Sequence, residues 1–419
     1  MIKAVKGTRD ILPPSSAVWN QVEAIARDVF RIYNYQEIRT PILEETALFA
    51  RGVGQETDIV SKEMYTFEDR DGSSLTLRPE ATASVMRAYI EHRLDQKPGL
   101  QKLYYIGPMF RRERPQKGRY RQFSQIGAEA IGSESPSVDA EVIEMVIDLL
   151  RRAGLEGFQL LVNSVGDQNC RPQYVALLKE KLLDVAAQLC DDCQRRAETN
   201  PLRVLDCKVP EDQAIINALP SIQDHLCEPC RTHFNAVKSH LDDRGISYEV
   251  RPRMVRGLDY YMRTTFEIVH GSLGAQNSVL GGGRYDGLAE SLGSRVHSPG
   301  IGFSIGEDRL VMSLEATSPV KEDPLVIVTF TAGDATRRAA VDAAAELRGQ
   351  GIRVEVAEGK LKRVFEIANK LNARLALICG ESETAAGEIS MKDMESQVQV
   401  QIGRELLLEK VKECLSKYR

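Results

Sequence analysis

The hexapeptide at 256–261, Arg-Gly-Leu-Asp-Tyr-Tyr, combines residue types that can bind a charged, flat ligand. The guanidinium of Arg256 matches the geometry of an anionic phosphate, and the phenols of Tyr260 and Tyr261 can both donate hydrogen bonds to a polar ring and accept them from it. The apolar run Thr265 to Val269 follows and predicts a strand, in which every second side chain faces the same surface. Taken alone, the hexapeptide also fits a structural Arg–Asp pair beside two half-buried tyrosines.

A second candidate for ligand binding is a basic run. From Arg111 to Arg121, six basic residues accompany one acid, Glu113, a local balance of 6 − 1 = +5. The whole chain has a net charge of −5 and a pI near 5.9, which argues against a generally basic nucleic-acid-binding surface. The run is therefore the obvious candidate for contact with a polyanion, although a solvated surface loop is the simpler interpretation of any charge run.

The cysteines offer possible metal ligands. Among eight cysteines, two CxxC pairs stand out, Cys190/Cys193 and Cys227/Cys230. Paired CxxC segments have the ligand spacing of a structural zinc site, and Cys207 and His233 are spare potential ligands. The 33 residues between the pairs exceed the usual spacing, and thiols also pack as small apolar groups. The sequence leaves zinc binding and simple burial open, whereas a disulfide frame is not expected in a cytosolic chain.

Length and composition indicate a soluble protein of several domains. The 419 residues exceed one ordinary core, so two or three domains are expected. Hydrophobic content of 42% and charged content of 27% are normal for a globular chain. No apolar stretch approaches the roughly 20 residues of a membrane span, and the first residues lack the apolar core of a signal peptide. We expect a cytoplasmic protein with no membrane partner.

Periodicity and turn residues predict the elements of the first 150 residues. A helix should follow Pro14, with apolar residues at every third or fourth position up to Ile32. A strand is expected over 38–43, and its Pro41 would confine it to an edge or an interface. Further elements are expected as a strand at 75–78, a helix opened by Pro79, strands at 103–110 and 122–131 forming a long hairpin around the basic run, and a helix opened by Ser135-Pro136.

The remaining chain indicates an insertion and a second domain. Residues 166–245 are helical, polar and rich in cysteine, and strand signals return at 248–253, 265–269 and 278–280. We expect a catalytic-type domain at 1–318, a linker at 319–324 and an α/β domain at 325–419. The expected elements of the last domain are strands at 325–331, 352–356 and 375–379 and helices at 334–349 and 358–371, with some parallel strand pairing.

Two common signatures are absent. The glycine-rich segment Gly281 to Gly287 matches neither the dinucleotide-binding spacing nor a phosphate-binding loop ending in Gly-Lys-Ser/Thr. A serine nucleophile elbow is also missing.

Ordered motifs carry a resemblance to a known family. The segment 110–129 resembles motif 2 of the class II aminoacyl-tRNA synthetases, 299–309 resembles motif 3, and 33–48 resembles motif 1. The hexapeptide at 256–261 and the segment 76–82 are similar specifically to histidyl-tRNA synthetases of the bacterial type. Lys6 to Leu12 matches that family's opening segment, so the likeness covers essentially the whole chain, including a C-terminal domain of the anticodon-binding type.

The resemblance implies an α+β fold and an activity. We expect an antiparallel catalytic sheet of six or seven strands, a helical insertion, and a C-terminal α/β domain with a mixed sheet. The family activates L-histidine with ATP to histidyl-adenylate and transfers histidine to the 3′ end of tRNA(His). It also implies a homodimer formed through motif 1. Mg²⁺ is implied with ATP by the class, and no residue of this chain is assigned as a metal ligand.

The resemblance assigns five residues to ATP. Charge that develops on the pentacovalent phosphorus must be stabilised by preorganised cations, so Arg256 and Arg111 are the expected catalytic groups. The implied contacts are Arg111 with the α-phosphate, Arg309 with the γ-phosphate, Arg256 from the opposite side, Glu113 with the adenine amino group, and Phe123 stacked on the base.

Histidine recognition needs two kinds of partner. The family positions that accept from the α-ammonium match Glu80, Thr82 and Gln125. Neutral imidazole has one donor and one acceptor nitrogen, and the residues that match its partners are Glu129 and Tyr261, with Tyr260 beside them. Singly, each could be a helix-capping acid, a strand polar residue or a core tyrosine. Ala81 departs from the glycine of many family members, with no loss of chemistry expected.

The hairpin loop is expected to meet the acceptor end of the tRNA. Gln116 offers an amide to a base edge, and Lys117 and Arg119 suit phosphates. Two alternatives are a non-catalytic regulatory subunit of ATP phosphoribosyltransferase and a general RNA-binding module. The first usually lacks a C-terminal domain and an intact hexapeptide, and the second leaves motif 3 and the Glu129/Tyr261 pair unexplained.

Overall fold

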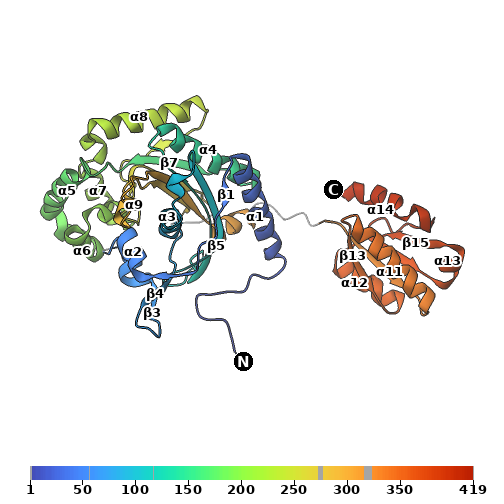
Figure 1. Ribbon diagram of the computed structural model, residues 1–419. Helices are drawn as coiled ribbons and strands as arrows, with labels where there is room; N and C mark the ends of the chain where they lie inside the picture. Colours follow the sequence, from blue (N-terminus) through green and yellow to red (C-terminus); the bar gives the residue numbers. More distant parts are fainter. Residues whose placement is uncertain (1, 56, 117, 272–276, 316–322, 419) are drawn as a thin grey trace. The chain divides into compact units, whose positions relative to one another are not determined.

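The computed structural model describes residues 2–55, 57–116, 118–271, 277–315 and 323–418. The chain divides into two compact units, Met1–Pro319 and Val320–Arg419, which are described separately below. Their elements are labelled in Figure 1.

An eight-stranded sheet is the framework of unit 1. Its strand order is β1-β5-β6-β11-β10-β9-β7-β8. The bounds in that order are Gln36–Glu37, Gln101–Phe110, Gln122–Ile131, Gly300–Gly306, Ser278–Arg284, Met262–Val269, Gln159–Ser164 and Glu249–Val250. The six inner strands are antiparallel, whereas β1 joins β5 and β8 joins β7 in parallel. The α+β fold is confirmed. The sheet is larger than expected in part because the two-residue strand β1 is too short to show a period, whereas the strand predicted at 248–253 is present but shortened to β8.

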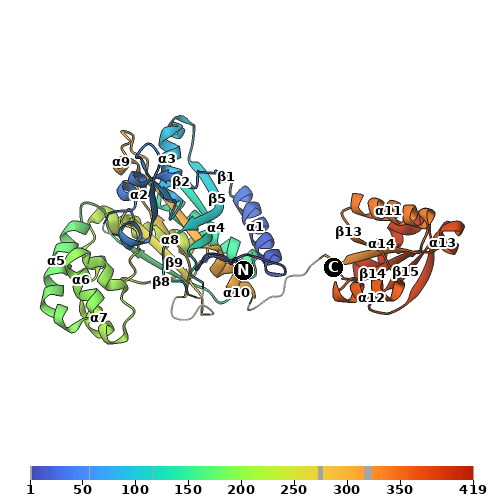
Figure 2. The same ribbon diagram turned by 90° about the horizontal axis from the view of Figure 1, so that it is seen from below.

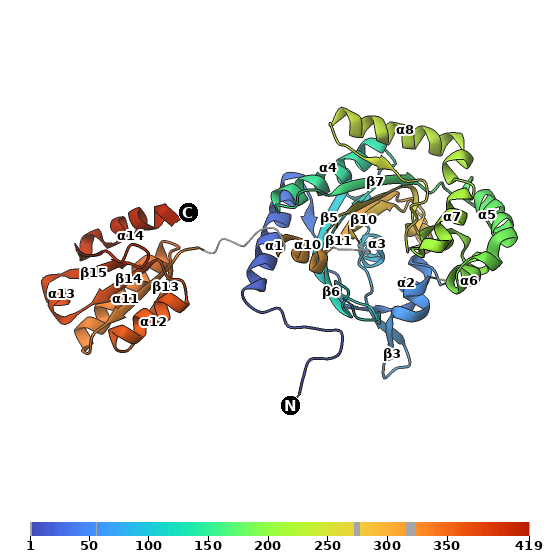
Figure 3. The same cartoon turned by 180° about the vertical axis from the view of Figure 1, so that it is seen from behind.

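The long hairpin predicted around the basic run is present. Strands β5 and β6 pair in continuous register from Gln101↔Ile131 to Phe110↔Gln122. The helix predicted after Pro14 is α1 (Ser15–Ile32), and the helix predicted at Ser135-Pro136 is α4 (Pro136–Arg152). Both lie outside the curve of the sheet with α8 (Glu228–Asp243) and α10 (Glu307–Glu315), whereas α3 (Thr82–Glu91) lies inside it, as Figures 1 and 3 show.

The predicted strand at 38–43 was wrong. The chain pairs on either side of Pro41 instead, through β1 and through β2 (Leu43–Glu45). Proline has no N–H to donate to a ladder, so pairing stops around it. Strand β2 belongs to a separate three-stranded sheet with β4 (Ser74–Leu77) and β3 (Tyr65–Glu68). Strand β4 matches the strand predicted at 75–78.

Two further boundaries differ from the sequence prediction. Helix α3 begins at Thr82 and not at Pro79, because the carboxylate of Glu80 accepts hydrogen bonds from the N–H groups of Thr82 and Ala83 at 2.7 and 2.9 Å. Strand β10 does not end at Leu280 but runs through three glycines to Arg284. Glycine weakens a strand in isolation, so this extension depends on pairing with β9 and β11 on both sides.

The segment expected to be a helical insertion is helical and has its own core. It contains α5 (Arg171–Val185), α6 (Asp191–Thr199) and α7 (Gln213–Ala218) before α8. These three helices lie together at one end of unit 1, as Figure 2 shows. Tyr174, Leu178 and Leu182 of α5 bury one face against Val204 and Ile216. The insertion therefore folds around apolar contacts separate from those of the main sheet.

Unit 2 is an α/β domain with a mixed sheet, as predicted, and the sheet has five strands, of which β15 and β16 were not predicted. Its order is β13-β12-β14-β15-β16, with bounds Arg353–Ala357, Leu325–Phe330, Leu375–Cys379, Glu388–Asp393 and Gln399–Gly403. The first three strands are parallel and the last two are antiparallel. Helices α11 (Asp334–Gly349) and α14 (Leu407–Leu415) pack on one face, and α12 (Leu361–Lys370) packs on the other. The remaining helices of the chain are α2 (Thr46–Gly52), α9 (Leu288–Ser291) and α13 (Glu381–Ala386).

Candidate active site

A cavity of about 850 Å³ in unit 1 gathers most of the residues predicted to carry chemistry. Its walls come from the inner strands of the sheet, the hairpin loop, the hexapeptide and part of the helical insertion, which lie far apart in the sequence. The predicted residues in its lining are Glu80, Thr82, Arg111, Glu113, Arg119, Phe123, Gln125, Arg256, Tyr260, Tyr261 and Arg309. Glu129 lies buried directly behind this lining, hydrogen-bonded to Thr82.

Glu80 has a structural task in addition to its expected one. Both of its oxygens accept backbone N–H bonds at the start of α3, and the Tyr260 hydroxyl lies 3.4 Å from Oε2. Burial raises the pKa of Glu80, and the N–H donors of Thr82 and Ala83 oppose that rise. Each carboxylate oxygen has two lone pairs, so capping leaves acceptor capacity directed at the cavity.

Gln125 has an acceptor with no protein partner. It lies on β6 opposite Gly107 and Gly306, neighbours that have no side chains. Its Oε1 is buried, and within the described residues it accepts no hydrogen bond. Leaving a buried acceptor unpaired costs about 1–3 kcal/mol, so an ammonium bound here would satisfy it. This is the contact expected for the α-amino group of histidine.

Glu129 is held by two hydroxyl donors. The Thr82 hydroxyl donates to Oε1 at 2.8 Å, and the Tyr285 hydroxyl donates to Oε2 at 2.6 Å. Burial raises the pKa of Glu129 to about 8, which exceeds the opposing effect of the two hydroxyl donors. A side chain at Gly302 would overlap this carboxylate, so the glycine makes room for it on the facing strand β11.

The raised pKa of Glu129 predicts a pH-dependent stability. The folded protein holds this proton more tightly than the unfolded chain, so the stabilisation is complete below the unfolded pKa of 4.5 and is lost as pH rises toward about 8. Each pH unit in that window changes the free energy of unfolding by up to roughly 1.4 kcal/mol. We expect the free energy of unfolding of Glu129→Gln, measured in urea, to rise relative to the parent as pH increases. Equal pH slopes for the two proteins would contradict the assignment.

Tyr260 and Tyr261 form the aromatic wall of the cavity. Their ring centroids lie 4.7 Å apart, and Tyr260 meets Tyr285 edge-on at 5.9 Å. All three are buried. Burial raises the pKa of Tyr261 and Arg256 lowers it, and the net shift is upward. The phenol of Tyr261 therefore stays a neutral hydroxyl that can donate to an imidazole nitrogen.

The side chain of Arg256 lies against strand β10 at Gly281, a position that has no side chain. Its Nη1 pairs with Glu267 Oε1 of β9 at 3.4 Å, and its Cζ lies 6.0 Å from the centroid of the Tyr261 ring. Burial acts to lower the pKa of Arg256, but Glu267 and the neighbouring tyrosines raise it, with the net shift upward. A Cβ at Gly281 of β10 would overlap the guanidinium. Glycine at this position is therefore what lets Arg256 lie flat in the cavity.

We expect Gly281→Ala to keep the fold but displace Arg256. The added methyl would meet the end of a flexible side chain, which can move away without disturbing the backbone. Adenylate formation should then fall by about 10-fold or more, since one misplaced cation weakens transition-state stabilisation. ATP–pyrophosphate exchange measures the rate, and Gly349→Ala, at the end of α11 in unit 2, is the control for a glycine loss outside the site, because its added methyl would meet open space. Normal exchange in Gly281→Ala would show that the position of Arg256 does not depend on this glycine.

The hairpin supplies an arginine and an aromatic ring to the same cavity. Arg111 donates from Nε to the Pro79 carbonyl at 2.9 Å, and its Cζ lies 5.3 Å from the Phe123 centroid. Glu113 lies between two cations, 3.8 Å from Arg111 and 3.2 Å from Arg119. The Phe123 ring and the Arg111 guanidinium lie next to each other and form one wall of the cavity. The expected contact of Glu113 with the adenine amino group stays a prediction.

Arg309 is anchored by carbonyl groups. Its Nε donates to the Gly118 carbonyl at 3.2 Å, and its Nη1 donates to the Ser278 carbonyl at 2.7 Å. Burial and the nearby Arg119 lower the pKa of Arg309. The positive charges of several guanidiniums around one cavity repel one another until an anion binds and neutralises them. A polyphosphate is the ligand that such an arrangement favours.

Two of the predicted tRNA contacts, Gln116 and Arg119, lie at the tip of the hairpin. Gln116 and Arg119 exchange backbone hydrogen bonds at 3.2 and 2.9 Å, which closes the tip. Both side chains are exposed, and Gln116 does not line the cavity. Lys117 lies outside the described residues.

Three residues of the site were not predicted from the sequence. Glu267 pairs with Arg256, Tyr285 donates to Glu129, and Gly281 makes room for Arg256. The glycine-rich segment was dismissed because it fits no phosphate-binding pattern. Its only signal in the sequence is a run of glycines inside a strand, which indicates that another group approaches the backbone closely.

Comparison with known proteins identifies the family. A model described as histidyl-tRNA synthetase matches residues 7–310, and a model described as anticodon binding domain matches residues 324–414. The chain belongs to the histidyl-tRNA synthetase family. It is 73% identical to the histidine–tRNA ligase of Solibacter usitatus, covering 97% of each chain, and 59% identical to that of Koribacter versatilis, covering 96% of this chain and 94% of the relative.

A solved structure agrees with this assignment. The apo histidyl-tRNA synthetase of S. aureus superposes with a TM-score of 0.81 at 40% identity, covering 98% of this chain and all of that one. A Bacillus halodurans structure described as an ATP phosphoribosyltransferase regulatory subunit/histidyl-tRNA synthetase shares the fold, with a TM-score of 0.63 at 21% identity over 91% of this chain and 98% of that one. Within the described ranges, no helix is long and apolar enough to cross a membrane.

Proposed function

We propose that this protein activates L-histidine with ATP and transfers the histidyl group to tRNA(His). The observation that carries the assignment is the cavity in which Arg111, Arg256 and Arg309 lie beside the unpaired acceptor of Gln125 and the hydroxyl-bound Glu129. The cations suit a polyphosphate, and the acceptors suit an amino acid with an imidazole side chain. The intact hexapeptide and the anticodon-binding domain disfavour the regulatory-subunit alternative.

The chemistry needs two displacements. The histidine carboxylate attacks the α-phosphorus of ATP, pyrophosphate leaves, and histidyl-adenylate forms. A terminal ribose hydroxyl of the tRNA then attacks the acyl carbon, and AMP leaves. Arg111 and Arg256 approach the α-phosphate from two sides and stabilise the charge that develops on it. No covalent bond to the protein is required.

Magnesium is proposed to enter with the nucleotide. The acids nearest the arginines are Glu113 and Glu267, and both already pair with guanidiniums. A magnesium ion prefers oxygen ligands and keeps several waters, so phosphate oxygens would supply most of its coordination. The cavity fits such a complex because its own cations are placed for phosphates, with the ion neutralising the remaining charge.

Two further assignments are proposals. Residues 325–419 would contact the anticodon stem-loop, and the hairpin tip with Gln116, Lys117 and Arg119 would contact the acceptor end. A homodimer through the motif 1 segment is supported by Ile42 and Leu43, which are 41% and 47% exposed. We expect histidine activation and histidyl transfer to tRNA to take place in the cytoplasm.

Histidine-dependent ATP–pyrophosphate exchange tests the function. The full chain should exchange label only when histidine is present, and analogues with an apolar side chain of similar size should fail because they offer no imidazole nitrogen to Glu129 and Tyr261. A regulatory subunit or an RNA-binding module would show no exchange. Light scattering tests the dimer and should give about twice the chain mass of 46.7 kDa.

A further inference from the structure

Six cysteines of the insertion gather into two clusters, each with one aspartate. In the described part of the chain, the first cluster is Asp167, Cys170, Cys227 and Cys230, and the second is Cys190, Cys193, Cys207 and Asp212. Within each cluster, the four potential ligand atoms lie within 4.8 Å of one another. The two CxxC pairs therefore belong to different clusters and cannot bind one ion together. His233 joins neither, because its Nε2 bonds Asp139 Oδ2 at 2.9 Å.

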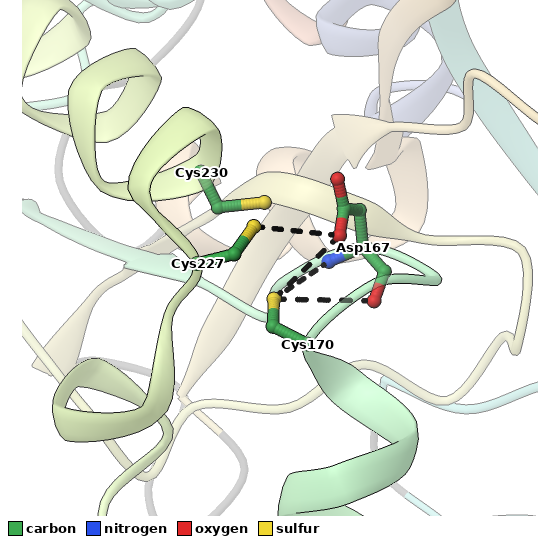
Figure 4. Close-up of side chains that lie close together, drawn as sticks. All are labelled: Asp167, Cys170, Cys227 and Cys230. Carbon is green, nitrogen blue, oxygen red and sulfur yellow. Dashed lines mark hydrogen bonds between the residues drawn. The ribbon is translucent and has the colours of Figure 1, made fainter.

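The first cluster is shown in Figure 4, where the three thiols and the carboxylate converge. Asp167 Oδ1 lies 3.6 Å from the sulfur of Cys170 and 3.7 Å from the sulfur of Cys227. For tetrahedral zinc with bonds of about 2.0 Å to oxygen and about 2.3 Å to sulfur, neighbouring ligand atoms lie about 3.5–3.8 Å apart. The observed separations agree with these edges.

The second cluster has similar dimensions. The sulfurs of Cys190 and Cys207 lie 3.9 Å apart, and the Cys207 sulfur lies 3.2 Å from Asp212 Oδ2. A disulfide needs two sulfurs about 2.05 Å apart, so this pair is not bonded. The separation is instead close to the edge of a metal-centred tetrahedron.

The same local structure presents both CxxC pairs. Cys190 is the N-cap of α6 with φ −61° and ψ 157°, and Cys227 is the N-cap of α8 with φ −64° and ψ 159°. The second cysteine of each pair, Cys193 or Cys230, follows in the first helical turn. A spacing of three residues brings both sulfurs to one side of the helix start. This repetition indicates a built ligand geometry and not chance burial.

Each cluster also buries a carboxylate where simple packing would not need one. Asp212 is 2% exposed, accepts the Cys190 N–H at 3.1 Å, and forms no ion pair within the described residues. Asp167 is 5% exposed, and its nearest cation is Arg263 at 3.9 Å. A buried carboxylate among thiols and apolar side chains is costly unless a cation compensates it. By contrast, Cys379 of unit 2 lies in an apolar core without such a group.

The ligand atoms of each cluster indicate the kind of metal. Metal binding replaces thiol protons, since the thiolate is the ligand. Three sulfurs and one oxygen in tetrahedral array suit zinc, whereas magnesium and calcium prefer all-oxygen sites. Four protein ligands leave no open position, which indicates a structural and not a catalytic ion.

We propose that the insertion binds two structural zinc ions, one at Asp167, Cys170, Cys227 and Cys230, and one at Cys190, Cys193, Cys207 and Asp212. The first ion would join the start of α5 to the start of α8. It would also lie near the hexapeptide at 256–261, because Arg171 next to Cys170 donates to the carbonyls of Tyr261 and Asp259. The second ion would join α6 to the segment that leads into α7.

Metal content of the full chain tests the proposal. Protein purified without chelator should contain two zinc ions per chain by plasma mass spectrometry. Cys170→Ala and Cys207→Ala should each lose one ion, and the double variant should lose both. Cys414→Ala, in unit 2, is the matched control and should keep two. Alanine is used because it packs like a thiol but cannot coordinate.

A thiol assay covers the case in which a variant fails to fold. In the unmodified chain, a mercurial reagent should release two zinc ions, and six thiols should change from slow to fast reaction with a disulfide reagent after zinc is removed. Absence of zinc after dialysis against zinc chloride, in protein that is folded by circular dichroism, would overturn the proposal. If the parent contained only one zinc ion per chain and each single variant lost it, the chain would have one site and not two. If the bound metal were iron, the assignment of zinc would be refuted.

Discussion

Replacing Arg256 with alanine is expected to lower kcat for adenylate formation by roughly 10²–10³, while KM for histidine changes much less. Arg256 lines the cavity, is partly buried, and is held by Glu267 at 3.4 Å. In the proposed mechanism its charge acts on the α-phosphate, where negative charge grows in the transition state, and not on the histidine side chain. A group that acts mainly in the transition state lowers kcat when it is removed.

The measurement is ATP–pyrophosphate exchange over a range of histidine concentrations. Arg256→Lys keeps the charge but loses the planar fork, and its kcat should lie between those of the parent and Arg256→Ala. Arg31→Ala is the matched control, because its guanidinium pairs with Asp28 on the exposed side of α1. An unchanged kcat in Arg256→Ala would remove this residue from the mechanism, and a change in KM alone would make it a binding residue.

Cutting the chain at Pro319 is expected to preserve histidine-dependent exchange but reduce tRNA charging by orders of magnitude. The cavity lies entirely in unit 1, and each unit has its own apolar core. Loss of unit 2 would remove one of two tRNA contacts, and linked contacts commonly increase affinity by roughly 10²–10⁴. The acidic chain, with a net charge of −5, is not expected to bind tightly through the hairpin alone.

Charging of tRNA and pyrophosphate exchange should be measured on the same fragment. Circular dichroism and light scattering establish that the fragment is folded and dimeric, so that exchange reports an intact cavity. Higher salt should weaken charging by the full chain, since phosphate contacts release counterions. A fragment that charges tRNA as well as the full chain would assign residues 325–419 another role.

The sequence by itself determined the elements whose signals are local. The bounds of α11 (Asp334–Gly349) and β14 (Leu375–Cys379) match the prediction, because alanine-rich and continuous apolar runs are unambiguous over these lengths. The β5–β6 hairpin was predictable because two apolar strands flank one polar loop. Residues of the cavity such as Arg256 and Gln125 were predicted because they lie in short motifs whose order and spacing can be read directly from the sequence.

Only the tertiary structure decided which distant groups meet. Tyr285 reaches Glu129 across 156 residues, and the strand pairing that brings them together has no local signal. The contact between Gly281 and Arg256 depends on the Arg256 guanidinium lying close against strand β10, which spacing cannot reveal. The cysteines show the same limit, since CxxC spacing predicts a pair of ligands but not which other pair completes the site. Long-range pairing is fixed by the burial of whole faces, and a short motif carries little of that free energy.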